Sequence, residues 1–169
     1  MENKLWNELA ESSEYVENKE LYQNHIIEQY KVYVEMADRI SARRNLANMF
    51  FLTLNTTILG AIGFSFEKIH LVNPKWLILI PILSILILVF VWVWLIRSYR
   101  NLNSAKYKVI GNLEKRLPAS PYWAGEWNEL GQGKDLKKYL PLTVLENVVP
   151  IIFGLIYIII GVFVIWIMN

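Results

Sequence analysis

Two uncharged stretches constrain this chain more than any other feature of its sequence. Residues 76–96 and residues 148–168 are each 21 residues long and contain no Asp, Glu, Lys, Arg or His. A helix rises about 1.5 Å per residue, so each stretch is long enough to cross a hydrocarbon core of about 30 Å. The chain is therefore expected to be an integral membrane protein.

A third uncharged stretch, residues 46–66, carries several polar side chains along its length. If this stretch also crosses the membrane, the chain has three transmembrane helices, and the distribution of basic residues favours that number. Arg39, Arg43 and Arg44 precede the first span, and four basic residues follow the second: Arg97, Arg100, Lys106 and Lys108. The positive-inside rule then predicts a cytoplasmic N-terminus and an external C-terminus.

Four tryptophans agree with this topology. Trp76 and Trp166 fall at the predicted outer ends of their spans, while Trp92 and Trp94 fall near the inner end of the second span. Indole rings favour the headgroup layer, so the joint pattern supports this topology; the alternative for any one of these residues is a packed aromatic side chain.

The cytoplasmic parts of the first two spans are predicted to be long helices. Residues 19–59 contain no Gly or Pro, which favours one helix that continues into the first span. Its polar half carries apolar side chains at alternating spacings of four and three, the pattern of a seam that packs against another helix. We interpret this seam as a candidate oligomer contact, formed by Ile26, Tyr30, Tyr33, Ala37 and Ile40. A second seam is expected after the second span, at Leu102, Ala105, Val109 and Leu113.

Charge favours pairing of these two cytoplasmic regions. Residues 1–45 hold six Lys or Arg and nine Asp or Glu, whereas residues 97–147 hold nine and five. An acidic region can therefore lie beside a basic one, although each exposed pair contributes only about 0–1 kcal/mol. Arg97 and Arg100 are candidate contacts for lipid headgroups; the alternative is that they act only as an orientation signal.

The connection between the second and third spans is predicted to be structured. Ser120 followed by Pro121 is typical of a helix N-terminus, and Gly131 is a candidate C-cap, so a short aromatic helix is expected between them. The third helix is expected to begin either at a capping box of Thr143 and Glu146 or with Pro150 in its first turn: both alternatives start it near the third span.

A polar stripe on the first span is the feature with the most functional content. Asn45, Asn48, Asn55 and Thr56 fall within a quarter to a third of the helix circumference. Such a stripe should face protein or water rather than lipid. It is therefore a candidate pore lining or, more commonly, a set of interhelical hydrogen bonds.

Small residues on the spans indicate close helix contacts. Gly60 and Gly63 lie near the outer end of the first span, and Gly154 and Gly161 share one face of the third.

No motif predicts a reaction. The absence of Cys excludes disulfide scaffolds, thiolate metal sites and cysteine nucleophiles. The GQGK sequence at residues 131–134 lacks the spacing of a phosphate-binding loop and is predicted to be a turn. Glu114, Glu126 and Glu129 are interpreted as a solvated surface. We expect no catalytic, cofactor-binding or metal site, no cofactor and no enzymatic activity.

Four segments of the sequence resemble a known family. They are YKVYVEMADRISARRNLANMFFLTLNTT at residues 30–57, RSYRNLNSAKYKVIGNLEKRLPASPYW at residues 97–123, EWNELGQGKD at residues 126–135 and YLPLTVLENVVP at residues 139–150. Together they resemble the RipA family of octameric bacterial membrane proteins over most of the chain. The resemblance implies a cytoplasmic-membrane location, eight subunits and a role in envelope physiology. A looser likeness, in architecture alone, is to small membrane effectors of bacterial defence systems.

The sequence thus predicts an all-α integral membrane protein with three transmembrane helices, two of them extended into a cytoplasmic helical hairpin, in a homo-oligomeric ring. Its expected parts are an acidic N-terminal segment (1–18), a cytoplasmic helical arm (19–45), transmembrane helix 1 (46–66), an external link (67–75), transmembrane helix 2 (76–96), a second cytoplasmic arm (97–117), a structured connection (118–147) and transmembrane helix 3 (148–168).

The first functional hypothesis is a non-enzymatic scaffold of the bacterial inner membrane, and the alternative is an oligomeric channel lined by the polar face of the first span. An effector of a defence system is a lower alternative. The expected partners are further copies of the chain, membrane lipid and another protein of the membrane or cytoplasm, but no nucleic acid.

Overall fold

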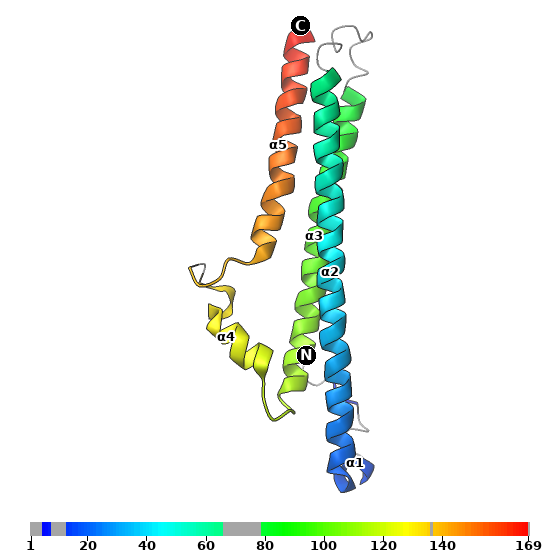
Figure 1. Cartoon of the computed structure of the whole chain (residues 1–169), viewed down its shortest axis with the longest axis vertical. Helices are drawn as coiled ribbons and strands as arrows, with labels where there is room; N and C mark the ends of the chain where they lie inside the picture. The colour runs from blue at the N-terminus through cyan, green and yellow to red at the C-terminus, as the bar shows by residue number, and fades with distance from the viewer. Residues whose placement is uncertain (1–4, 8–12, 66–78, 136, 169) are drawn as a thin grey trace. The chain divides into compact units, whose positions relative to one another are not determined.

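The computed structural model describes residues 5–7, 13–65, 79–135 and 137–168, and no strand occurs among them. The predicted external link and Trp76 lie outside these residues. The prediction of an all-α chain is confirmed for the described part (Figure 1). Its long helices are α2 (Lys19–Ser65), α3 (Leu79–Glu114) and α5 (Leu142–Met168), and its short elements are α1 (Ser13–Glu17), the π-helix η5 (Pro121–Glu126), α4 (Trp127–Glu129) and the 3-10 turn η6 (Gly131–Gly133).

Three of the described helices are long and apolar enough to cross a membrane, namely α2, α3 and the Val144–Trp166 part of α5. The chain by itself buries only 11% of the apolar window of α2 and 22% of the windows of α3 and α5. Most of this apolar surface must therefore contact lipid or another protein.

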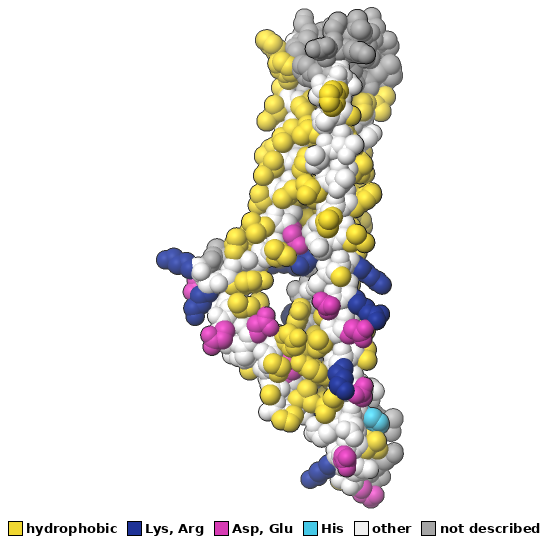
Figure 2. Space-filling view, viewed as in Figure 1, with side chains coloured by type: hydrophobic (Ala, Val, Ile, Leu, Met, Phe, Trp, Pro, Cys, Tyr) yellow, Lys and Arg dark blue, Asp and Glu magenta, His cyan; other side chains and the backbone are white. Residues whose placement is uncertain are grey.

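The chain divides into two compact units, and α2 and α3 each contribute to both. We call Met1–Ala42 with Arg100–Pro141 the polar unit, and Arg43–Tyr99 with Leu142–Asn169 the membrane unit. Hydrophobic side chains cover much of the visible face of the membrane unit, whereas most of the visible charged side chains belong to the polar unit (Figure 2).

Aromatic packing holds the three helices of the membrane unit together. Phe51 of α2 stacks on Trp92 of α3 with ring centroids 5.6 Å apart, and Phe153 of α5 lies 6.2 Å from the same indole. A second cluster joins Ile85 and Val89 of α3 to Tyr157 of α5. Trp92 is only 2% exposed, which favours the packed-aromatic alternative over a ring that faces lipid headgroups. Its indole fills the space between helices instead.

Two glycines of α5 allow that helix to approach α3. A Cβ atom at Gly154 would lie 3.4 Å from a methyl group of Val89, and one at Gly161 would lie 3.4 Å from a methyl group of Ile82. This confirms that the two glycines mark a packing face. Gly60 and Gly63 of α2, in contrast, face open space in the isolated chain.

Helix α5 begins at Leu142, so both predictions for its first turn are wrong. Thr143 lies inside the helix rather than at its N-cap, and the carboxylate of Glu146 lies near Arg44 instead of the helix end. Pro150 also lies inside the helix and is fully buried.

In the polar unit, α2 and α3 run antiparallel, because Tyr30 contacts Glu114 and Ser41 contacts Asn103. The predicted seam on the second of these helices is confirmed at Leu113, which is buried, but is wrong at its first two positions. Leu102 and Ala105 are exposed, and Asn103 and Lys106 lie in the contact instead. The ammonium group of Lys106 lies 5.1 Å from the ring centroid of Tyr33, a position that apolar patterning does not reveal.

Candidate functional site

The best-defined polar site of the described chain is centred on Glu114, the last residue of α3. Its side chain is only 1% exposed, so the interpretation of Glu114 as a solvated carboxylate is wrong. Glu126 and Glu129 are exposed, as expected. A buried carboxylate is stable only when donors surround it, and four donors surround this one.

Both oxygens of Glu114 accept hydrogen bonds. The Tyr30 hydroxyl donates to Oε1 at 3.2 Å, as does the backbone N–H of Tyr122 at 3.1 Å. The Ser120 hydroxyl donates to Oε2 at 2.7 Å, as does the backbone N–H of Trp123 at 2.9 Å. One side chain of α3 thus joins α2 to the first turn of η5.

Ser120 completes this arrangement as the N-cap of η5. Its hydroxyl oxygen accepts the N–H of Ala124 at 3.2 Å, and Pro121 occupies the first helical position, as the sequence predicts. The helix that follows is a π-helix, in which the N–H of Gly125 donates to the carbonyl of Ser120 at 3.0 Å. The cap was predictable, but the wider helical turn was not.

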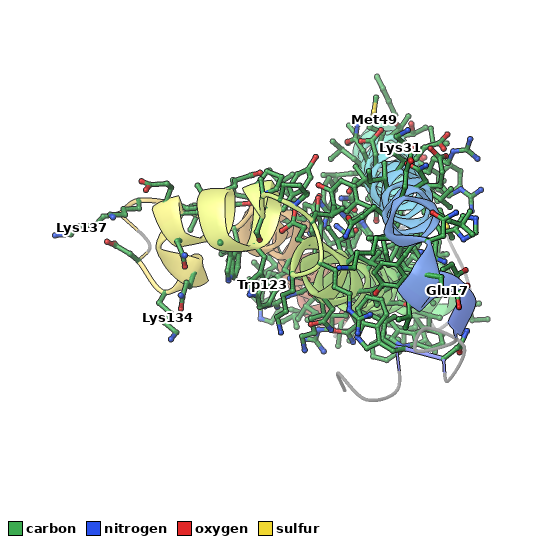
Figure 3. The ribbon with its side chains drawn as sticks, turned by 90° about the horizontal axis from the view of Figure 1, so that it is seen from below. Glu17, Lys31, Met49, Trp123, Lys134 and Lys137 are labelled. Carbon is green, nitrogen blue, oxygen red and sulfur yellow. The ribbon has the colours of Figure 1, made fainter. Side chains whose placement is uncertain are left out.

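The side chain of Trp123 makes a second contact with α3, in addition to the backbone hydrogen bond to Glu114. A Cβ atom at Gly111 would lie 2.8 Å from Cδ2 of the indole, so only glycine permits this contact. The indole therefore lies directly on α3, and Figure 3 shows Trp123 next to that helix. Glu114 and Gly111 together anchor residues 118–141, which we call the connecting segment.

The rest of the connecting segment extends away from α3 and has little core of its own. None of the residues of η5, α4 or η6 is buried, and Trp123 and Trp127 are 42% and 38% exposed. The helical part of the connecting segment ends at the predicted turn. In this turn Gly131, Gln132 and Gly133 all have positive φ angles. This turn confirms Gly131 as the residue that terminates the helix.

Beside this anchor lies a groove of about 460 Å³ between α2, α3 and η5. Three tyrosines line it, Tyr30, Tyr107 and Tyr122, together with the carboxylates of Glu35 and Asp38. Burial, reinforced by the negative charge of Glu114, raises the pKa of Tyr30 from 10.0 to about 12. Burial also raises the pKa of Tyr107, with smaller contributions from Tyr122 and Glu126. Both phenols therefore stay neutral hydrogen-bond donors at physiological pH.

An aromatic cluster fixes the start of α2. The guanidinium of Arg116 lies 3.4 Å from the ring centroid of Trp6 and also hydrogen-bonds the Tyr22 hydroxyl. The Tyr15 hydroxyl lies 2.8 Å from Nδ1 of His25, which is exposed. The contacts of Arg116 thus tie Trp6 and Tyr22 to the residues that follow α3.

The structure separates the four residues of the predicted polar stripe. Asn48 accepts a 3.0 Å hydrogen bond from Nε1 of Trp92, and Asn55 is completely buried, with its amide donating to the Phe51 carbonyl at 2.8 Å. Asn45 and Thr56 are exposed in the isolated chain, and the Thr56 hydroxyl donates to the carbonyl of Leu52.

The carbonyl of Asn55 also takes part in an interhelical contact. It accepts a 2.9 Å hydrogen bond from the Tyr157 hydroxyl of α5. A further polar contact joins α2 to α5, because Nε of Arg44 lies 3.4 Å from Oε1 of Glu146, with both side chains at most 15% exposed. These polar groups of α2, which belong to the membrane unit, thus bind other helices of the same chain.

The residues of the predicted oligomer seam also have partners within the chain. Ile26, Ala37 and Ile40 are buried in the isolated chain, and Tyr30 and Tyr33 are partly buried against α3. The seam pattern was read correctly as a helix contact, but the contact is internal, so these buried side chains are not available to a second copy. Arg97 and Arg100, the candidate headgroup contacts, are exposed.

The model of one protein family, described as the octameric membrane protein family (8xMP), matches residues 27–166. The chain belongs to this family. No curated protein and no solved structure matches the chain. Membership agrees with the three apolar helices and shows that the chain is a subunit of an oligomeric membrane protein. The family's description does not contain the RipA name, so that part of the resemblance stays a prediction.

Proposed function

We propose that the protein is a non-enzymatic scaffold of a bacterial inner membrane, where its oligomer organises membrane or cytoplasmic partners in envelope physiology. The observation that carries this proposal is the connecting segment. It is anchored by Glu114 and Gly111, yet its tryptophans are exposed. An ordered segment that exposes large aromatic side chains is suited to binding another protein surface.

The chemistry at Glu114 supports a structural role for that carboxylate. Four donors occupy its two oxygens, and two of these donors are backbone N–H groups that fix the path of the connecting segment. A carboxylate that acts as a general base needs a free lone pair directed at a substrate. We therefore assign Glu114 to positioning the segment, and we propose no reaction.

We further propose that the polar unit lies in the cytoplasm and the C-terminus outside. Arg97 and Arg100 are exposed at the boundary between the units on α3, as the positive-inside rule requires of an orientation signal. Because the chain contains no Cys, a single Lys137→Cys variant gives one labelling site. A membrane-impermeant maleimide should label it only after the cells are permeabilised; labelling of intact spheroplasts would reverse the orientation.

A channel remains the second candidate function, because one face of α2 is polar and exposed. Thr53, Thr56 and Thr57 lie on it, and Asn45 is exposed on the same helix. Asn48 and Asn55 no longer support a pore wall, since one is hydrogen-bonded to Trp92 and the other is completely buried. A pore would thus have to be lined mainly by threonine hydroxyls.

Reconstitution into liposomes distinguishes the scaffold from the channel. For a scaffold we expect proteoliposomes loaded with an ion-sensitive dye to leak no faster than protein-free liposomes, while native mass spectrometry gives eight copies. A Thr56→Leu variant serves as the pore test, with Leu52→Ile on an exposed position of the same helix as its control. Flux that Thr56→Leu abolishes and Leu52→Ile preserves would establish the channel and overturn the scaffold.

A further inference from the structure

We propose that the lysine-rich end of the connecting segment of one copy docks into the tyrosine-lined groove of a second copy, where Lys137 meets Asp38. This inference rests on the proposed oligomeric scaffold and specifies the contact between its subunits. It identifies two surfaces of the polar unit, one basic and one acidic and aromatic, as complementary partners.

The groove has the chemistry that an ammonium group requires. Tyr30, Tyr107 and Tyr122 line it, and the ring centroids of Tyr107 and Tyr122 lie 6.2 Å apart. Aromatic faces beside a carboxylate bind cations through both charge and ring quadrupole. The carboxylate in question is that of Asp38, which is exposed.

The other charged residues of the groove already have partners on α2. Lys31 Nζ lies 2.7 Å from Glu28 Oε1, and the Glu35 carboxylate lies 2.6 Å from Arg39. Asp38 makes no ion pair with any residue that the structure describes. The groove therefore offers one uncompensated negative charge between aromatic walls.

The end of the connecting segment supplies matching positive charge. Lys134, Lys137 and Lys138 are exposed, and none of them forms an ion pair within the described residues. The nearby carboxylate of Asp135 accepts the backbone N–H of Lys137 at 3.0 Å. Three lysines beside one aspartate leave this end strongly basic.

A second copy, rather than the same copy, can bring these surfaces together. Figure 3 shows Lys134 and Lys137 at the end of the segment that points away from α2, on which Lys31 lies, while Trp123 lies beside α3. Glu114 and Gly111 fix the segment at its base, so a contact with a second copy forms without any change in this anchor. A contact of one surface with a different surface on the next copy closes into a ring when its rotation divides a full turn, which is one way to build an octamer.

Disulfide cross-linking tests this contact directly, because the natural chain contains no Cys. The variant Asp38→Cys/Lys137→Cys, in nanodiscs of zwitterionic phosphatidylcholine, should give a ladder of covalent oligomers on oxidation. The matched control is Gln29→Cys/Lys137→Cys, since Gln29 is exposed on α2 but does not line the groove. We expect no ladder from this control or from either single variant.

Charge reversal provides a second readout. Asp38→Lys and Lys137→Asp should each lower the fraction of octamer seen by native mass spectrometry, and the double variant should restore it. The inference would be overturned if octamers form but neither cross-link nor respond to charge reversal. A ladder in the Gln29→Cys/Lys137→Cys control would overturn it too. Both results would leave the oligomeric scaffold intact. If the basic end binds lipid headgroups instead, no pair-specific ladder forms in these nanodiscs. A wild-type chain that is monomeric in the same nanodiscs would contradict the proposed scaffold itself.

Discussion

The backbone N–H of Trp123 donates a 2.9 Å hydrogen bond to Oε2 of Glu114, so the last residue of a long helix positions a tryptophan nine residues later. The bond lies within a buried network that also includes Tyr30 and Ser120. Because this network is the anchor of the connecting segment, its removal should change the segment more than the helices.

Glu114→Gln should destabilise the anchor. An amide group presents N–H donors where the carboxylate accepted them, so at least one backbone N–H loses its partner, at a cost of about 1–3 kcal/mol. We expect a lower thermal midpoint in nanodiscs and more rapid proteolysis of residues 118–141. Glu126→Gln, at an exposed carboxylate of η5, is the matched control and should leave both measurements unchanged. Equal stability of the two variants would refute the anchoring role.

Gly111→Ala should displace the indole of Trp123. The new methyl group would lie 2.8 Å from Cδ2, near the base of a ring whose backbone is already held by Glu114, so overpacking should cost about 1–3 kcal/mol. Gly125→Ala is the control, because its Cβ would meet only the carbonyl oxygen of Ser120, at 3.6 Å. Tryptophan fluorescence should shift to the red in the first variant alone. An unshifted spectrum would show that the indole does not depend on Gly111.

Alkaline titration should reveal Tyr30 as a late-ionising phenol. Its pKa is about 12 in the folded chain and near 10.0 in an unfolded one, so the folded state binds this proton more tightly. Its contribution to stability is therefore complete below pH 10 and is lost as the pH rises towards 12. Ultraviolet difference spectroscopy should show one fewer late tyrosine in Tyr30→Phe than in the wild type. The control is Tyr99→Phe, because Tyr99 is not part of the hydrogen-bond network of Glu114. Identical titration curves for the two variants would refute the prediction.

Trp92 and Asn48 should be energetically coupled. Their 3.0 Å hydrogen bond joins α3 to α2 inside the membrane unit, where such bonds contribute about 0.6–2 kcal/mol. A double-mutant cycle of Trp92→Phe and Asn48→Leu, read from unfolding in mixed micelles, should return coupling in that range. Trp94→Phe with Asn48→Leu is the control, since Trp94 is 68% exposed, and should show additive effects. Additivity in both cycles would mean that the bond has no role in helix association.

Local patterns predicted much of the fold because they depend on neighbouring residues. Uncharged runs predicted the spans, Ser120 and Gly131 predicted the two ends of a short helical region, and the spacing of Gly154 and Gly161 predicted a packing face. In each case the signal and its structural cause lie within one element. Such local signals do not depend on how the rest of the chain folds.

Contacts between distant residues explain what the sequence could not reveal. Glu114 resembled a surface carboxylate, because its donors come from α2 and from the start of η5. Lys106 entered the sequence analysis only as one of the basic residues after the second span, whereas in the structure its ammonium group lies over the ring of Tyr33. The residues of the polar stripe have different environments for the same reason. The hydrogen-bond partner of Asn48, for example, is Trp92, which is 44 residues away. The GQGK turn was read correctly, since positive φ angles at its glycines are a local property.

A structure of the full assembly in lipid nanodiscs tests the central claim, that this is an oligomeric scaffold, most directly. We predict a closed ring of eight copies, with the connecting segment of each copy against its neighbour and no continuous water path along the symmetry axis. A wet path through the membrane, lined by Asn45 and Thr56 of every copy, would contradict the account and establish a channel.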